Sequence, residues 1–177
     1  MILKYYPLYE DVIEPRWGTK HSACFDLSAY LANLTKIISY LPTNEKFELH
    51  CCSEIENKKF IEIVPNSRVL VPTGLILDIP ENYSVRIHPR SGLSFKNGLV
   101  LANSEGIIDS DYKEELFIMI TNISMHRQKI YHGDRIAQGE LIKSLDYKIE
   151  RCYDRPTRSE RMGGFGSTGV SHENQNA

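Results

Sequence analysis

The sequence predicts an all-β protein, either a barrel or a sandwich, because apolar segments of strand length recur along most of the chain. These segments are rich in β-branched and aromatic residues, and Pro, Gly, Asn and Asp separate them. Many short strands at this spacing are typical of β-barrels and β-sandwiches. The 177 residues are enough for one domain with its own core, and no linker or internal repeat divides them.

Five segments carry the strand pattern most clearly. In chain order they are residues 60–64, 69–79, 83–87, 116–123 and 136–142. The run from Leu116 to Ile120 is continuously apolar, which favours a strand buried on both faces, with another subunit as one candidate cover.

One segment carries a helical pattern instead. Its apolar residues recur at the spacing of an amphipathic helix over residues 28–41, and they are Leu27, Leu31, Leu34, Ile38 and Leu41. Extended structure from Phe25 to about Ala32 is the competing interpretation, and it is the one favoured by the family resemblance described below.

Charge and composition narrow the classes of function. Lys and Arg total 21 against 23 Asp and Glu, so the net charge of -2 gives no drive toward nucleic acid. No apolar run is long enough to span a membrane, and the N-terminus lacks a signal-peptide pattern, so we expect a cytoplasmic protein. The four cysteines and six histidines show no zinc-ligand spacing, so the sequence offers no support for a zinc site.

Four short clusters combine polar groups with glycines or apolar runs. They are residues 89–93, 106–112, 133–138 and 163–169. Arg90, Ser91 and the amides near Gly92 suit a phosphate group, although a turn with a solvated Arg fits equally well. On a strand, Asp109 and Asp111 would point to the same side, where one could act as a general base or both could help to hold a cation. Alternatively, they are turn residues.

The other two clusters also have plain structural interpretations. Residues 133–138 read as a turn that leads into a strand, with Asp134 and Arg135 as candidate ion-pair partners. The glycine-rich segment 163–169 suits phosphate wrapping by backbone amides with an aromatic ring on a base, or else a flexible tail.

In combination these clusters resemble the five ordered motifs of the homotrimeric dUTPase family. The motifs correspond to residues 23–29, 89–93, 106–115, 133–138 and 161–169. The resemblance implies a jelly-roll-like β-barrel over residues 1–160, with an insertion at about 31–64, and a mobile C-terminal arm over 161–177. It also implies a homotrimer in which all three chains build each active site.

The resemblance implies a reaction as well: hydrolysis of dUTP to dUMP and pyrophosphate, which keeps uracil out of DNA and supplies dUMP for thymidylate synthesis. Asp109 resembles the catalytic carboxylate that orients a water for attack on the α-phosphorus. Asp26 resembles the acid that holds Mg²⁺ through water. The substrate-binding residues implied are Arg90, Ser91, Gly92, Asn103, Gly106, Ile108, Tyr112, Gln138, Arg161, Phe165, Gly166, Ser167 and Thr168.

Within that set, the family assigns separate tasks. Asn103 would read uracil, and the Tyr112 ring would exclude a 2′-hydroxyl. Arg90, Ser91 and Gln138 would contact phosphates. In the arm, Phe165 would cover the base while Arg161, Ser167 and Thr168 close on the γ-phosphate side.

The chain departs from the family pattern at several positions. Cys24 and Glu114 stand where glycine is usual, and the shortened approach to the fifth motif leaves Arg158 or Arg161 as its arginine. The segment between Ala29 and Pro72 is longer than is typical, and we expect it to pack and to offer a candidate surface for a protein partner.

Two other functions stay open from the sequence. A dCTP deaminase of the same fold needs a glutamate in a distinct motif and lacks this glycine-rich arm. A nucleotide sensor that does not catalyse need not keep a carboxylate such as Asp109 aligned on water. Release of pyrophosphate discriminates between the enzyme and the sensor.

Overall fold

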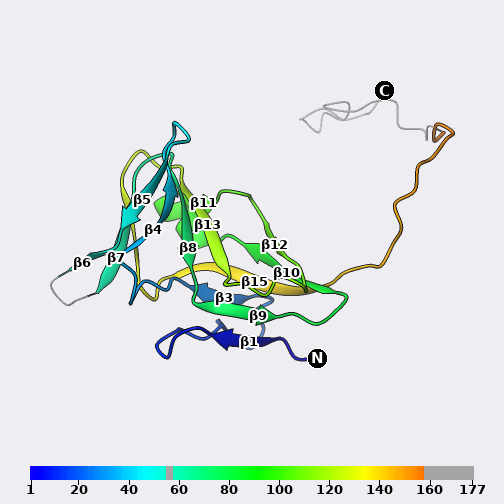
Figure 1. The fold of residues 1–177 in the computed structure, drawn as a ribbon, viewed down its shortest axis with the longest axis horizontal. Coiled ribbons are helices and arrows are strands. Elements are labelled where there is room, and N and C mark those ends of the chain that lie inside the picture. Colours follow the sequence, from blue (N-terminus) through cyan, green and yellow to red (C-terminus); the bar gives the residue numbers. More distant parts are fainter. Residues whose placement is uncertain (55–57, 158–177) are drawn as a thin grey trace, which may run out of the picture. The chain divides into compact units, whose positions relative to one another are not determined.

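Two five-stranded antiparallel sheets hold most of the strands in the part of the chain that the structure describes, residues 1–54 and 58–157 of a computed structural model (Figure 1). The first sheet runs β12 (Gly106–Ile108), β10 (Tyr83–His88), β15 (Arg135–Lys143), β3 (Phe25–Ser28) and β2 (Arg16–Trp17). The second sheet runs β11 (Leu99–Leu101), β13 (Phe117–Asn122), β8 (Arg68–Pro72), β4 (Lys36–Tyr40) and β5 (Lys46–His50).

Smaller sheets complete the described strands. One pairs β1 (Lys4–Pro7) with β9 (Leu75–Asp78). The other runs β14 (Gln128–Tyr131), β7 (Lys59–Ile63) and β6 (Cys52–Ser53). The predicted all-β fold is therefore confirmed.

Apolar side chains from both five-stranded sheets meet in one core. Leu27 and Val85 of the first sheet are 0% exposed, as is Val71 of the second, while Ile118 of the second is 1% exposed. Burial of such side chains contributes about 1.5–3 kcal/mol each, so this shared core is what holds the two sheets together.

Strand β13 is buried on one face in the single chain, and cover of its other face by a second subunit stays a prediction. Its burial alternates: Ile118 and Ile120 point into the core, whereas Phe117 is 37% and Met119 42% exposed. A continuously apolar run thus serves one core face and leaves the other face of β13 apolar and accessible in the single chain.

The long strand expected at 69–79 is divided into β8 and β9. Gly74 lies at the break and has φ +70°, a backbone conformation that residues with a side chain rarely adopt. A Cβ at this position would also lie 2.6 Å from Val12 Cγ2. Thr73 stabilises the break, because its hydroxyl donates to the Leu116 carbonyl at 2.7 Å.

The helical interpretation of residues 28–41 is wrong. Strand β3 ends at Ser28, residues 32 and 33 form a turn, and β4 begins at Lys36. Backbone partners far along the chain decide this: the Ala29 N–H donates to the Asp134 carbonyl and the Tyr30 N–H to the Pro72 carbonyl, both at 2.8 Å. Such long-range pairing overrides local periodicity.

The segment between residues 31 and 64 contains the β4–β5 hairpin, which extends the edge of the second sheet. Ile37 is 7% exposed, and Ser39, at 1%, donates from its hydroxyl to the Arg68 carbonyl at 2.8 Å. The described part of the segment 31–64 is therefore packed against the second sheet at Ile37 and Ser39.

A short helix, α1 (Ser91–Asn97), occupies a segment where a turn was one of the alternatives. It begins directly after Pro89 and Arg90 and ends at Gly98, which has φ +65°. Glycine in this left-handed conformation is an ordinary signal of a helix end.

The chain divides into two units, Met1–Leu145 and Asp146–Ala177. The described residues of the second unit, 146–157, are exposed and contain no helix or strand. Within the described parts of the chain, no helix has the length and apolar character needed to cross a bilayer.

Candidate active site

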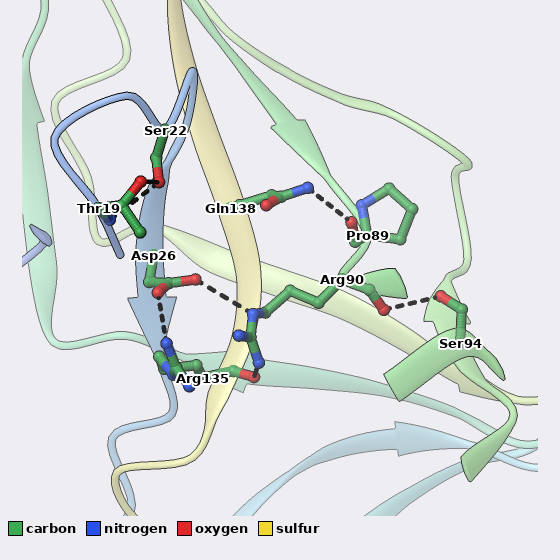
Figure 2. A network of polar contacts seen from close by, with 8 residues as sticks. All are labelled: Thr19, Ser22, Asp26, Pro89, Arg90, Ser94, Arg135 and Gln138. Atoms are coloured by element: carbon green, nitrogen blue, oxygen red, sulfur yellow. Dashed lines mark hydrogen bonds and ion pairs between the residues drawn. The ribbon is translucent and has the colours of Figure 1, made fainter. Parts of the chain in front are cut away.

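The carboxylate of Asp26 on β3 joins two arginines from separate parts of the chain (Figure 2). Its Oδ1 accepts from Arg90 Nε at 3.1 Å, and its Oδ2 accepts from Arg135 Nη1 at 2.9 Å. The side chain of Asp26 is 13% exposed, that of Arg90 25%, and that of Arg135 52%. Two cations against one carboxylate leave a net positive charge, which suits an anionic ligand.

Strand register explains why these groups meet. Asp26 on β3 lies opposite Gln138 on β15, and Gln138 lies opposite His88 on β10. Side chains at paired positions point to the same face. Their neighbours Phe25 and Ile87 point into the core, so Asp26, His88 and Gln138 line the outer face of the first sheet.

The loop between β10 and α1 is held against this face. Gln138 donates from Nε2 to the Pro89 carbonyl at 3.1 Å, and the Ser94 hydroxyl donates to the Arg90 carbonyl at 3.1 Å (Figure 2). Ser91 and Gly92 are exposed, and a Cβ on Gly92 would meet nothing within 4 Å. The loop therefore offers Arg90, a hydroxyl and open backbone to a ligand.

A second group of predicted site residues lies on the segment around β12. Gly106 pairs with Ile87 of β10, and a Cβ on Gly106 would lie 3.0 Å from Ile87 Cβ and 3.6 Å from Asn103 Nδ2. Because Gly106 has no side chain, β12 can pack closely against β10 beside Asn103. Asn103, Gly106 and Ile108 border a hollow of about 100 Å³ with Phe117 and Met119.

Asp109 is exposed directly after β12 and belongs to a turn. The Tyr112 N–H donates to the Asp109 carbonyl at 3.2 Å, and the Tyr112 hydroxyl donates to the Glu115 carbonyl at 2.8 Å. Burial, with smaller contributions from Glu114 and Glu115, raises the pKa of Tyr112, so its ring carries a neutral hydroxyl at physiological pH. Asp109 is therefore exposed to solvent on a turn that its backbone bond to Tyr112 closes.

One chain does not bring the two groups together. The register between β10 and β12 places Asp109 next to Ser84, at the start of β10, whereas Arg90 follows its end at His88. Those two ends are about 13 Å apart at the usual rise per strand residue. Asp109 and Arg90 of the same chain therefore lie toward opposite ends of β10.

The expected ion pair between Asp134 and Arg135 is not what forms. Asp134 Oδ2 accepts from the Tyr131 N–H at 2.8 Å, closing the turn at Gly133, and Arg135 binds Asp26 instead. Sequence reasoning missed Arg135 as a partner of Asp26, because only the register of β15 against β3 brings them together.

Larger hollows lie elsewhere in the described part of the chain. One of about 360 Å³ borders Tyr9, Tyr30 and Phe117, and one of about 280 Å³ borders Ile38, Tyr40 and Met119. Both are predominantly apolar and contain neither Asp26 nor Asp109, so volume alone does not locate the chemistry. Arg158, Arg161, Phe165, Gly166, Ser167 and Thr168 lie outside the described residues.

Comparisons with known proteins agree with the fold and the motif order. A dUTPase family model matches residues 54–169. A deoxyuridine 5'-triphosphate nucleotidohydrolase of Brucella melitensis is 45% identical over 111 residues, covering 63% of this chain and 71% of the relative. One from Caulobacter vibrioides is 31% identical over 160 residues, covering 90% and 88%.

Solved structures give the same picture. A Streptococcus mutans dUTPase matches with TM-score 0.58 and 25% identity, covering 81% of this chain and 98% of its own. A Staphylococcus bacteriophage 80alpha dUTPase matches with TM-score 0.69 and 22% identity, covering 96% and 99%. The fold and the site together define an all-β enzyme of jelly-roll-like architecture. More particularly, the chain belongs to the dUTPase family, as its motifs predicted.

Proposed function

We propose that this protein hydrolyses dUTP to dUMP and pyrophosphate. The relatives named above carry that activity in their names, and the chain shares their motifs. The observation that carries the proposal is the Asp26–Arg90–Arg135 network, which leaves positive charge beside an open loop at Ser91 and Gly92. A triphosphate is the ligand of this family that needs such a site.

In the proposed complex, Arg90 and the loop amides bind the phosphates, and Ser91 supplies a further hydroxyl donor. Gln138 fixes the loop, because its amide already donates to the Pro89 carbonyl. Asp26 orients Arg90, because its carboxylate forms an ion pair with the Arg90 guanidinium. Holding the phosphates in one geometry is itself a large part of catalysis.

We assign Asp109 as the group that orients the attacking water toward the α-phosphorus. Its exposure allows contact with water and substrate, and the neighbouring turn fixes its backbone. Asn103, beside the hollow under β12, reads the uracil edge, with the backbone at Gly106 and Ile108. Asn103 is exposed in the single chain, and once a bound base covers it, a wrong base would leave its donors or acceptors unpaired.

Tyr112 stands as the wall against a 2′-hydroxyl in this proposal. Its hydroxyl is held by the Glu115 carbonyl, so the ring has little freedom to yield to a ribonucleotide. The glycine-rich residues 161–177 would complete the site over the base and γ-phosphate, and their contribution stays a prediction from the sequence.

The separation of Asp109 from Arg90 within one chain supports a shared site. Each complete site would take Asp109 from one chain and the phosphate loop from another, in the homotrimer that the resemblance implies. The apolar outer face of β13, with Phe117 and Met119 exposed, is a surface that such assembly would cover.

Magnesium fits this site if substrate phosphates supply most of its ligands. Asp26 offers the carboxylate oxygens that Mg²⁺ prefers, but two guanidinium groups already neutralise its charge. Asp26 would therefore contact the ion through water, and phosphate oxygens would bind the ion directly. Such an ion supplies neutralisation of phosphate charge. A phage phi11 dUTPase of S. aureus has been described with a structural Mg(II) ion.

In the cell, the proposed reaction would lower dUTP, keep uracil out of DNA and supply dUMP for thymidylate synthesis. A cytoplasmic location, no nucleic-acid or membrane partner, and a protein partner at the 31–64 insertion stay predictions from the sequence.

The test is pyrophosphate release from dUTP, dTTP, dCTP and UTP with Mg²⁺, each with and without EDTA. Turnover confined to dUTP and abolished by EDTA is the expected result. Binding of dUTP, seen as a rise in melting temperature, without release of pyrophosphate from any nucleotide would favour the sensor function. Ammonia release from dCTP would favour the deaminase.

A further inference from the structure

Three potential metal ligands from separate segments of the chain converge beside the first sheet. Cys24 precedes β3, His88 ends β10 and Glu140 lies in β15, and their ligand atoms all lie within 4.8 Å of one another. All three residues are partly buried. They are distant in sequence, which is why the chain shows no zinc-ligand spacing.

The register places the three side chains on one face. Phe25 lies opposite Gly139 and points into the core, so Glu140, the next residue of β15, points outward, and Cys24 directly precedes β3 at this position. His88 lies opposite Gln138, whose side chain shares that outward face with Glu140. The convergence is thus fixed by backbone pairing rather than by flexible side chains alone.

The distances suit a tetrahedral ion. His88 Nε2 lies 3.6 Å from Glu140 Oε2. Ligand atoms about 2.0–2.3 Å from one zinc ion at tetrahedral angles lie roughly 3.3–3.6 Å from each other. The pair therefore needs almost no movement, and Cys24 Sγ needs an approach on the order of an ångström at most to complete three ligands.

A second carboxylate faces the other nitrogen of the same imidazole. Glu105 Oε1 lies 3.6 Å from His88 Nδ1, and Arg86 Nη1 lies 3.8 Å from Glu105 Oε2. A ligating histidine commonly donates its remaining N–H to a carboxylate, which fixes the ring and its tautomer. Glu105 faces that nitrogen and needs a movement of about half an ångström to accept its N–H, an observation independent of the three ligands themselves.

We propose that Cys24, His88 and Glu140 bind one Zn²⁺ ion per chain, with water as the fourth ligand. Thiolate, imidazole and carboxylate together match zinc rather than magnesium, which prefers oxygen ligands only. Cys24 is also one of this chain's own departures from its family's pattern. The ion would tie β3, β15 and β10 together two residues from Asp26 and stabilise that part of the sheet.

Cobalt provides the direct test, because Co²⁺ occupies zinc sites and a thiolate ligand gives it an intense near-ultraviolet band. The full-length, reduced, metal-free protein is titrated with Co²⁺ and then Zn²⁺, without nucleotide or Mg²⁺. We expect one Co²⁺ per chain with a thiolate band, displacement by one Zn²⁺, and a higher melting temperature with Zn²⁺. Absence of stoichiometric binding or of the thiolate band would overturn the proposal.

Variants locate the site. Cys24→Ser should abolish the thiolate band, and His88→Gln should weaken Zn²⁺ binding by at least tenfold, whereas the matched control Cys52→Ser, on exposed β6, should bind as the parent does. Glu105→Gln should weaken binding by about 10-fold or more as an orienting residue. A band that survives Cys24→Ser, or is lost in Cys52→Ser, contradicts the assignment.

The readouts separate this proposal from the proposed function. The cobalt spectrum of the unsubstituted chain is decisive even where a variant folds poorly. All binding is measured without nucleotide, so its failure leaves dUTP hydrolysis untouched, and absence of dUTP turnover leaves the zinc site untouched.

Discussion

Replacement of Asp26 by Asn tests whether its carboxylate organises the phosphate-binding side of the site. The substitution keeps the size and one acceptor oxygen but removes the charge that both arginines share. Because the amide also turns an N–H₂ group toward one guanidinium, we expect both a loss of stability and a less ordered Arg90.

The magnitude follows from the exposure of each partner. A hydrogen bond to a charged group contributes about 1.5–3 kcal/mol, and the Arg90 contact, with side chains 13% and 25% exposed, retains much of that value. The Arg135 contact is discounted to less than about 1 kcal/mol, because Arg135 is 52% exposed and solvent screens it. With one acceptor kept, the expected loss is about 1–3 kcal/mol, or roughly 2–12 °C in melting temperature.

Thermal unfolding without nucleotide or metal measures this loss, and steady-state kinetics measures its consequence for dUTP. We expect KM to rise several-fold as Arg90 loses its orienting partner. Asp78→Asn is the matched control, because its ion pair with Lys113 is exposed at both ends and should contribute nothing measurable. An unchanged melting temperature for Asp26→Asn, or an equal fall in the control, would refute the reasoning.

Three further predictions concern other parts of the molecule. Asp109→Asn should lower kcat by ~10² or more with little change in melting temperature, since the side chain is exposed. Burial lowers the pKa of His132, and its Nδ1 accepts from the Leu31 N–H at 3.0 Å, so the imidazole is neutral in the folded protein. The unfolded chain binds the proton first, so stability present above about pH 6.5 should decline as the pH falls below it, and thermal unfolding from pH 7.5 to 5.5 will show this. Gly106→Ala should cost about 1–3 kcal/mol in chemical denaturation and raise KM for dUTP, because its Cβ would crowd Ile87 at 3.0 Å.

Each of these predictions has a control or a contrary outcome. Unchanged turnover in Asp109→Asn would move the base elsewhere. His132→Asn should reduce the acid dependence while His21→Gln, at an exposed position, should keep it; equal profiles for both variants contradict the assignment. If Gly106→Ala keeps full stability and an unchanged KM, β10 and β12 can move apart to accommodate the methyl group without cost, and the prediction is wrong.

Much of the fold was predictable because local patterns carry it. Alternating β-branched and aromatic residues identified the strands at 83–87 and 136–142, which the structure has at β10 and β15. The five motifs identified the family, because each is a short local cluster whose residues and order can be read directly from the sequence. The helical pattern at 28–41 failed for a physical reason: leucines at that spacing also fit turns and strands whose backbone bonds to distant residues.

By itself, the sequence determined the all-β class and the family, since residue types and local spacing encode these, and the site residues it names stay predictions. Only the tertiary structure decided which groups meet. The pairing of Asp26 with Arg135, and the convergence of Cys24, His88 and Glu140, depend on the register of strands far apart in the chain. Register is set by burial of one sheet face and by long-range backbone hydrogen bonds, and neither is local to any motif.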